Sequence, residues 1–207
     1  GGSMETHSGA TITETSAMRV AAAWRSVNII SGTVGTLPLD LIVRDGESSR
    51  RPAVGHKLRR VLTVKPNGWQ TPSEVRRMMQ AHLLLRGNAY ALKVKILGEV
   101  VGLIPLHPDR VMVEQLDDMS MRYRVTRSNG QFDILTAADV FHLRGMSLNG
   151  VTGLSVLSHM RESLGLALRS EEAGAQLMRN GQFTGGVYEH PERLSDEAYE
   201  RLKASIA

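Results

Sequence analysis

Phe141-His142-Leu143-Arg144-Gly145 and, shortly after it, Asn149-Gly150-Val151-Thr152-Gly153-Leu154-Ser155 form the stretch that decides the fold. The first segment is a short apolar run that favours a strand, and the second contains two closely spaced glycines that favour turns. A helical pattern follows and continues to about Asn180, and a glycine-rich strand pattern comes after it over residues 181–187. The stretch is therefore predicted to join a β-rich half of the chain to a long helix.

The composition limits the classes of protein that the chain can represent. Its 207 residues suit one domain or one and a half, and 42% hydrophobic residues suffice for a core although only 4% are aromatic. Cysteine is absent, which excludes disulfides and thiolate metal sites. No apolar run approaches the roughly 20 residues that cross a bilayer, and no signal peptide is visible, so we expect no membrane partner.

The N-terminal segment carries no periodic pattern. Its first four residues are typical of a cloning remnant and the next ten are polar, so we expect residues 1–14 to be a tag and a disordered N-terminus. Thr15 or Ser16 can then cap a helix, because apolar side chains recur at steps of three or four over residues 20–34.

A second helix has the clearest start signal in the chain. Thr71 is the expected N-cap, Pro72 occupies the first helical position, and Glu74 completes a capping box. Gly87 ends this helix. Residues 88–144 then alternate apolar and polar side chains between turn signals, which predicts an antiparallel meander.

Together these patterns predict an α+β fold, in which an antiparallel meander has flanking helices and one long helix spans about 154–180. At 1.5 Å per residue that helix would be about 40 Å long. We expect the folded domain to occupy residues 15–193. Ser195 can cap a further helix, so residues 194–207 are expected to be the truncated start of a C-terminal helix.

Glycines mark the places where the chain is predicted to turn at the long helix. Either Gly150 or Gly153 is expected to have a positive φ, so valine at these positions should harm folding rather than any chemistry. The predicted structural turn residues are Gly145, Gly150, Gly153 and Gly181.

The patterns that would support catalysis are incomplete. Residues 153–157 lack the second glycine of a nucleophile elbow, and no lysine follows Gly153 as a phosphate-binding loop requires. The seven histidines show no metal-site spacing. We therefore predict no catalytic residue, no cofactor and no metal. The alternative of an α/β hydrolase would require Ser155, His142 and His159 to converge in one cleft.

Basic residues are concentrated in the first half of the chain. Residues 1–100 carry 14 Lys and Arg against 7 Asp and Glu, whereas residues 101–207 carry 11 against 14. This imbalance favours a contact between the basic surface of one subunit and the acidic surface of its neighbour, as in a head-to-tail ring. A nucleic-acid contact is the alternative. The candidate residues are Arg50, Arg51, Lys57, Arg59, Arg60, Arg76 and Arg77.

Four segments in a fixed order resemble the portal proteins of tailed bacteriophages, specifically the HK97-like family. The first has a short helical stretch, a Pro-Asn turn and the capped Thr71, and the second reads Gly87-Asn88-Ala89-Tyr90. The third reads Leu103-Ile104-Pro105-Leu106-His107-Pro108 and the fourth is the stretch at 141–155 with the glycines after Asn180. The resemblance covers residues 16–207, although Leu154-Ser155-Val156 replaces the commoner Leu-Ser-Pro.

The resemblance implies a structural protein without enzymatic activity, of which this chain would be the N-terminal half and mostly the wing domain. It implies a homo-oligomeric ring, usually of twelve subunits, at one capsid vertex, through which double-stranded DNA is packaged and ejected. The implied partners are other portal subunits, the terminase, the major capsid protein and head–tail connector proteins. The implied location is the virion, and the host cytoplasm during assembly. A stand-alone DNA-binding module using the basic residues is an alternative, and it predicts steeply salt-dependent binding by this chain alone.

Overall fold

The computed structural model describes residues 4–7, 11–45, 49–180 and 195–206. The chain divides into two units, residues 1–169 and 170–207. The boundary falls inside the long helix α5 (Val156–Asn180), which the sequence placed wholly within one domain over residues 15–193. The second unit also contains α6 (Asp196–Ile206), which has two acidic residues in its first turn.

The helix after Thr71 begins where its cap signal predicted, but the cap predicted at Thr15 or Ser16 is wrong, because that helix begins only at Ala21, after Val20 and without a side-chain cap. α4 (Pro72–Arg86) has a complete capping box between Thr71 and Glu74, and it ends at Gly87 with a φ of 74°. Hydrogen bonds from the backbone and then the side chain of Thr71 lower the pKa of Glu74. α3 (Lys57–Thr63) is shorter, and its N-cap is the imidazole of His56, which accepts a hydrogen bond from the Leu58 amide.

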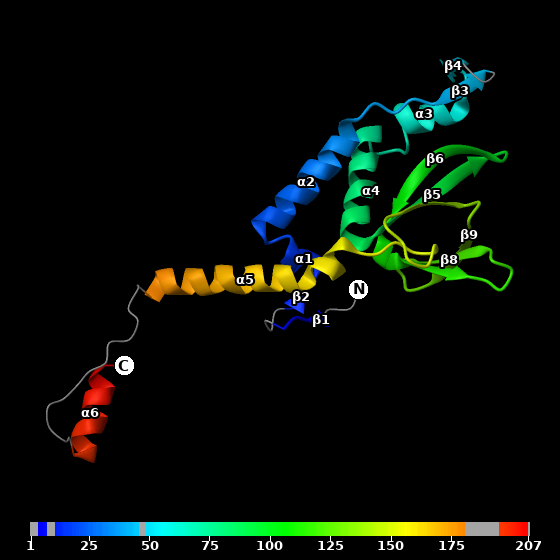
Figure 1. Cartoon of the computed structure of the whole chain (residues 1–207). Coiled ribbons are helices and arrows are strands. Elements are labelled where there is room, and N and C mark those ends of the chain that lie inside the picture. The colour runs from blue at the N-terminus through cyan, green and yellow to red at the C-terminus, as the bar shows by residue number, and fades with distance from the viewer. Residues whose placement is uncertain (1–3, 8–10, 46–48, 181–194, 207) are drawn as a thin grey trace. The chain divides into compact units, whose positions relative to one another are not determined.

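The C-terminal half of α2 (Ala21–Thr36) packs against the first turns of α4 (Figure 1). Gly35 is buried in this contact, because a Cβ at its position would lie 3.1 Å from Ser73 O. Ser73 Oγ and Arg76 Nη2 both donate to Gly35 O, at 2.8 and 2.7 Å. Arg77 Nη2 donates to Asn28 Oδ1 at 2.8 Å.

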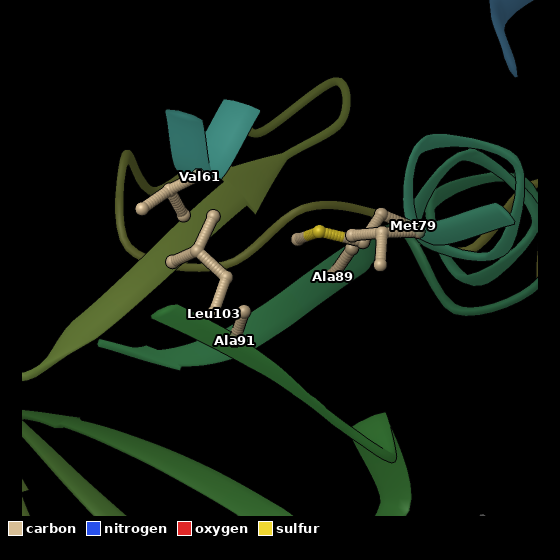
Figure 2. Packing of buried hydrophobic residues seen from close by; sticks show 6 residues of the cluster. Val61, Met79, Ala89, Ala91 and Leu103 are labelled. Atoms are coloured by element: carbon tan, nitrogen blue, oxygen red, sulfur yellow. The ribbon is translucent and has the colours of Figure 1, made fainter. Parts of the chain in front are cut away.

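A three-stranded antiparallel sheet with the order β10-β5-β6 forms the centre of the first unit. β5 (Asn88–Ile96) and β6 (Glu99–Leu106) form a hairpin, and β10 (Val140–Arg144) pairs with the first half of β5. α3 and α4 cover one face of this sheet. Figure 2 shows the core between them, where Val61 and Met79 from the helices meet Ala89, Ala91 and Leu103 from the sheet.

A second three-stranded antiparallel sheet contains β7 (Val111–Gln115), β8 (Met121–Thr126) and β9 (Phe132–Thr136). The α+β class and these strands agree with the prediction, but residues 88–144 form two sheets rather than one continuous meander. The short 3-10 helix η1 (Pro108–Arg110) separates β6 from β7, and Val140 returns the chain to β5 opposite Leu92.

Aromatic side chains join the two sheets. Tyr90 from β5, Tyr123 from β8 and Val140 from β10 are each less than 5% exposed and form one cluster. The Tyr90 and Tyr123 rings make an edge contact with their centroids 6.3 Å apart. These buried rings pack the two sheets together.

The N-terminal segment is more ordered than the sequence indicated. β1 (Met4–Glu5) pairs with β2 (Thr11–Ile12), and α1 (Glu14–Ala17) follows. The expected disorder over residues 1–14 is therefore corrected for these described residues. The physical reason is that Ile12 is buried with Ala17, Val20 and Leu164, a contact with α5 that a local pattern does not reveal.

A two-stranded hairpin completes the first unit. β3 (Ile42–Asp45) pairs in antiparallel register with β4 (Ser49–Pro52).

Candidate functional site

The stretch at residues 141–155 forms a tight joint in which three glycines approach one another. Gly145 N donates to Gly87 O at 2.8 Å. A Cβ on Gly153 would lie 2.0 Å from Gly87 O, and a Cβ on Gly87 would lie 2.3 Å from Leu154 O. Real Cβ atoms do not approach backbone atoms so closely, so the end of α4 and the segment leading to α5 can meet only through glycine.

Asn88 links the parts of this joint through its side chain. Its Oδ1 accepts hydrogen bonds from Gly153 N at 2.8 Å and from His142 Nε2 at 3.0 Å. Its Nδ2 donates to Gly153 O at 2.9 Å and to Arg86 O at 3.3 Å. Asn88 is buried, and these four bonds use the donors and acceptor of its amide, so it connects α4, β10 and the start of α5.

His142 extends the network to the second sheet. Because Asn88 Oδ1 can only accept, we assign the proton to His142 Nε2, which leaves Nδ1 to accept from Tyr123 OH at 3.3 Å. The His142 ring also stacks at a tilt on Tyr90, with centroids 4.4 Å apart. Burial, and then the nearby Arg144, lowers the pKa of His142 to about 4, so the imidazole is neutral at neutral pH.

The loop before α5 is held by its own polar side chains. Asn149 Oδ1 accepts from the amides of Val151 and Thr152, both at 2.9 Å, and Arg144 Nη1 donates to Gly150 O. Gly150 has a φ of 70°, as predicted for one of the two glycines, and open space surrounds its missing Cβ. Gly153 is required not for its φ but because the carbonyl oxygen of Gly87 leaves no room for a Cβ. Gly181 lies outside the described residues.

Ser155 has a structural role at the start of α5. Its Oγ donates to Leu85 O at 2.8 Å and accepts from Ser158 N at 3.3 Å, which is the geometry of a helix cap. His142 is occupied by Asn88 and Tyr123. Within the described residues no hydrogen bond joins Ser155 Oγ to His142 or to the ring of His159, so these three do not form a nucleophile and its base.

The basic residues separate into three places. Arg76 and Arg77 hold α2 against α4, whereas Arg50 and Arg51 lie in the exposed strand β4. Lys57, Arg59 and Arg60 lie in α3, and Lys57 forms an ion pair with Glu99 at the tip of the β5–β6 hairpin. Of these basic residues, Arg76 lines a smaller hollow between α2 and α4, whereas Lys57 and Arg60 line a larger hollow beside α3.

That hollow is a groove of about 580 Å³ between α3, the turn at residues 64–70 and the β5–β6 hairpin. We call it the hairpin groove. Lys57 and Arg60 were among the residues predicted from the sequence, whereas Lys65 and Trp69 were not, although Trp69 lies directly beside the Pro-Asn turn. Its principal lining residues are Lys57, Arg60, Lys65, Trp69, Val94, Val100, Val101 and Ile104.

Among the residues that the structure describes, no three His, Asp or Glu side chains are grouped so that they could hold a metal ion. No helix in the described part of the chain is both long enough and apolar enough to span a membrane.

The joint at residues 141–155 and the aromatic cluster between the sheets hold the elements of the first unit together. The pattern of the family described as "Phage portal protein" matches residues 21–207. The chain belongs to the phage portal protein family.

Individual relatives agree with this assignment. The chain is 30% identical over 182 residues to the portal protein of Enterobacteria phage HK97, covering 87% of this chain and 42% of the relative. It is 33% identical over 206 residues to the probable portal protein of Streptomyces phage phiC31, covering 95% of this chain and 44% of the relative. The chain therefore spans less than half the length of these curated relatives.

The fold also matches a solved structure described as the neck of a native gene transfer agent particle, computed with C12 symmetry. The TM-score is 0.66 at 21% sequence identity, and the match covers 92% of this chain and 53% of that chain.

Proposed function

We propose that this chain is the N-terminal, wing-forming part of a portal protein, which assembles into a ring at one vertex of a tailed-phage capsid. Double-stranded DNA would pass through that ring during packaging and ejection. The observation that carries the proposal is the family match over residues 21–207. The likeness to a particle neck with C12 symmetry supports a ring of twelve subunits.

The architecture of the chain suits a part that bears load rather than one that performs chemistry. The Asn88 network and the three-glycine joint fix the start of α5 to the central sheet.

The proposed location is the virion, preceded by the host cytoplasm during assembly. The proposed partners are other portal subunits, the terminase, the major capsid protein and head–tail connector proteins. The proposed protein has no enzymatic activity of its own.

Electron microscopy of the full-length protein tests this proposal. We expect closed rings with about twelve-fold symmetry when particles are imaged over a series of salt concentrations. Persistent monomers at every salt concentration would overturn it. Analytical ultracentrifugation of the present chain, compared with the full-length protein, would then show how much of the association depends on residues outside it.

The DNA-binding alternative makes a different prediction for the same two proteins. If the basic residues bind DNA on their own, the present chain should retard a short DNA duplex at low salt, and the affinity should fall steeply as salt rises. Arg59→Glu with Arg60→Glu should abolish that binding. Under the portal proposal, the isolated chain shows no such retardation.

A further inference from the structure

We propose that the hairpin groove is a docking site for an acidic segment of a partner protein, and that Trp69 receives a large apolar side chain of that segment. The proposal concerns a surface of the single chain and does not require a ring. It rests on the rigidity of Trp69, the nature of the groove wall and the charge of the groove rim.

Trp69 is a large apolar side chain that a rigid turn holds in solvent. Trp69 is 68% exposed, yet its backbone amide donates a hydrogen bond to Asn67 Oδ1 at 3.1 Å. Asn67 Nδ2 in turn donates to Leu103 O at 3.1 Å, and Leu103 N donates to Pro66 O at 2.7 Å. The turn is thus fixed to β6, so a ligand that contacts Trp69 does not have to order the backbone that presents it.

The wall of the groove is aliphatic. Val94, Val101 and Ile104 line it from the β5–β6 hairpin, and Val101 is 41% exposed. Tryptophan is enriched among the residues that dominate binding at protein–protein contacts, and the aliphatic wall beside it adds apolar surface that a ligand can bury. This wall favours a ligand that carries apolar side chains.

The outer edge of β6 is closed to strand addition, so the ligand is recognised through side chains. Leu103 uses its amide and carbonyl on the turn at Pro66 and Asn67. Pro105 has no amide hydrogen, and the register of the hairpin shifts beside Val101. Such features protect an edge strand from pairing with another chain.

The charge of the rim selects an acidic ligand. Lys57, Arg60 and Lys65 line the groove, and no carboxylate does. Lys57 is already paired with Glu99. Across the described residues, neither Arg60 nor Lys65 takes part in an ion pair, so both can meet Asp or Glu side chains of a partner.

Nucleic acid fits these observations less well. A nucleic-acid strand is held by cations that follow its phosphates and by several aromatic side chains on which successive bases stack. The hairpin groove has one aromatic side chain, and its valines and isoleucine give a phosphate backbone nothing to bind. We therefore assign the groove to an acidic, apolar peptide segment and treat DNA as an outcome of the test.

A displayed library of random peptides of about twelve residues identifies the ligand class directly. Purified chain is used to select peptides, and the most enriched peptide is synthesised with a fluorophore and titrated by fluorescence anisotropy. We expect enriched peptides to contain several Asp or Glu residues and at least one large apolar residue. Replacing the acidic residues of the peptide by Asn or Gln should weaken binding about tenfold or more.

Matched variants locate the binding to the groove. Trp69→Ala and Arg60→Glu should each weaken binding about tenfold, whereas Trp24→Ala and Arg50→Glu should leave it unchanged. Trp24 is also exposed but lies on α2, and Arg50 is an exposed arginine of β4. Circular dichroism of each variant confirms folding.

Three results would overturn the proposal. Selection could yield no acidic, apolar consensus, or binding could be equally weakened by Trp24→Ala and Trp69→Ala. A single-stranded or duplex oligonucleotide could also bind more tightly than the best peptide and lose affinity with Arg60→Glu. None of these results depends on whether the full-length protein forms rings.

Discussion

Single atoms decide whether the joint between the sheet and α5 can form. The Cβ that alanine would place at residue 153 falls 2.0 Å from Gly87 O and 2.7 Å from Gly145 N. Gly150 lies three residues earlier and differs in kind, because its φ of 70° is unfavourable for alanine but no atom occupies the space around it. Substitution of Gly153 therefore tests the effect of a steric collision, whereas substitution of Gly150 tests the effect of backbone strain alone.

We predict that Gly153→Ala destabilises the chain by about 3 kcal/mol or more, because backbone atoms must move to relieve the overlap. Gly150→Ala should cost only about 1 kcal/mol, the price of the left-handed conformation. Urea unfolding followed by circular dichroism measures both. Equal losses for the two variants would show that the contact at Gly87 is not the reason for glycine at position 153.

The amide of Asn88 provides a second test at the residue scale. Asn88→Ala removes the acceptor for Gly153 N and His142 Nε2 and the donor to Gly153 O. Leaving such buried groups without partners should cost about 2–3 kcal/mol in the free energy of unfolding. Asn129→Ala, in the exposed turn between β8 and β9, is the control and should change stability by less than about 0.5 kcal/mol. Similar effects of the two substitutions would contradict the linking role of Asn88.

At the scale of elements, local signals predicted much of the fold. The capping box at Thr71 and Glu74 and the glycine at position 87 bounded α4 because caps are formed by neighbours in sequence. Alternation predicted strands within residues 88–144, and β8 and β10 lie in that range. The alternation could not show that β10 leaves the second sheet and pairs with β5, because this pairing joins residues about fifty positions apart.

The joint was only partly predictable for the same reason. The glycines were visible in the sequence, and one positive φ was expected among them. The roles of Asn88 and Gly87 were not visible, because each depends on contacts with residues 142–154 across the fold. The sequence predicted one set of basic contact residues. In the structure, Arg76 and Arg77 instead hold α2 against α4, and Arg60 lines the hairpin groove.

At the scale of the whole molecule, two half-buried histidines connect packing to pH. Burial, with smaller contributions from His107 and Arg86, lowers the pKa of His82 to about 4, while Asp109 opposes the shift. Burial, and then the nearby Arg144, lower the pKa of His142 to about 4. Both imidazoles are therefore neutral in the folded chain over a range in which the unfolded chain, with a pKa near 6.5, takes up protons.

The sign of the effect follows from this difference. A histidine whose folded pKa is lowered contributes its full stability above about pH 6.5, and this contribution is lost as pH falls from about 6.5 to about 4. The acidic groups act in another window, because the carboxyls of Asp109, Glu114 and Asp139 have lowered pKa values and lose their contribution only below their usual range near 4. Stability lost between about pH 6.5 and pH 5 is thus assigned to the histidines.

We predict that the thermal midpoint of the chain falls by on the order of 5 °C between about pH 7 and pH 5, a modest value because both imidazoles are partly hydrated. His142→Gln can keep the hydrogen bond to Asn88 without titrating, so it should flatten this pH dependence, and His82→Gln in addition should flatten it further. His159→Gln, at an exposed position of α5, should leave the slope unchanged. The same slope in wild type and in the double variant would mean that other groups take up the protons, and that the packing around Asn88 and His142 does not couple the molecule to pH.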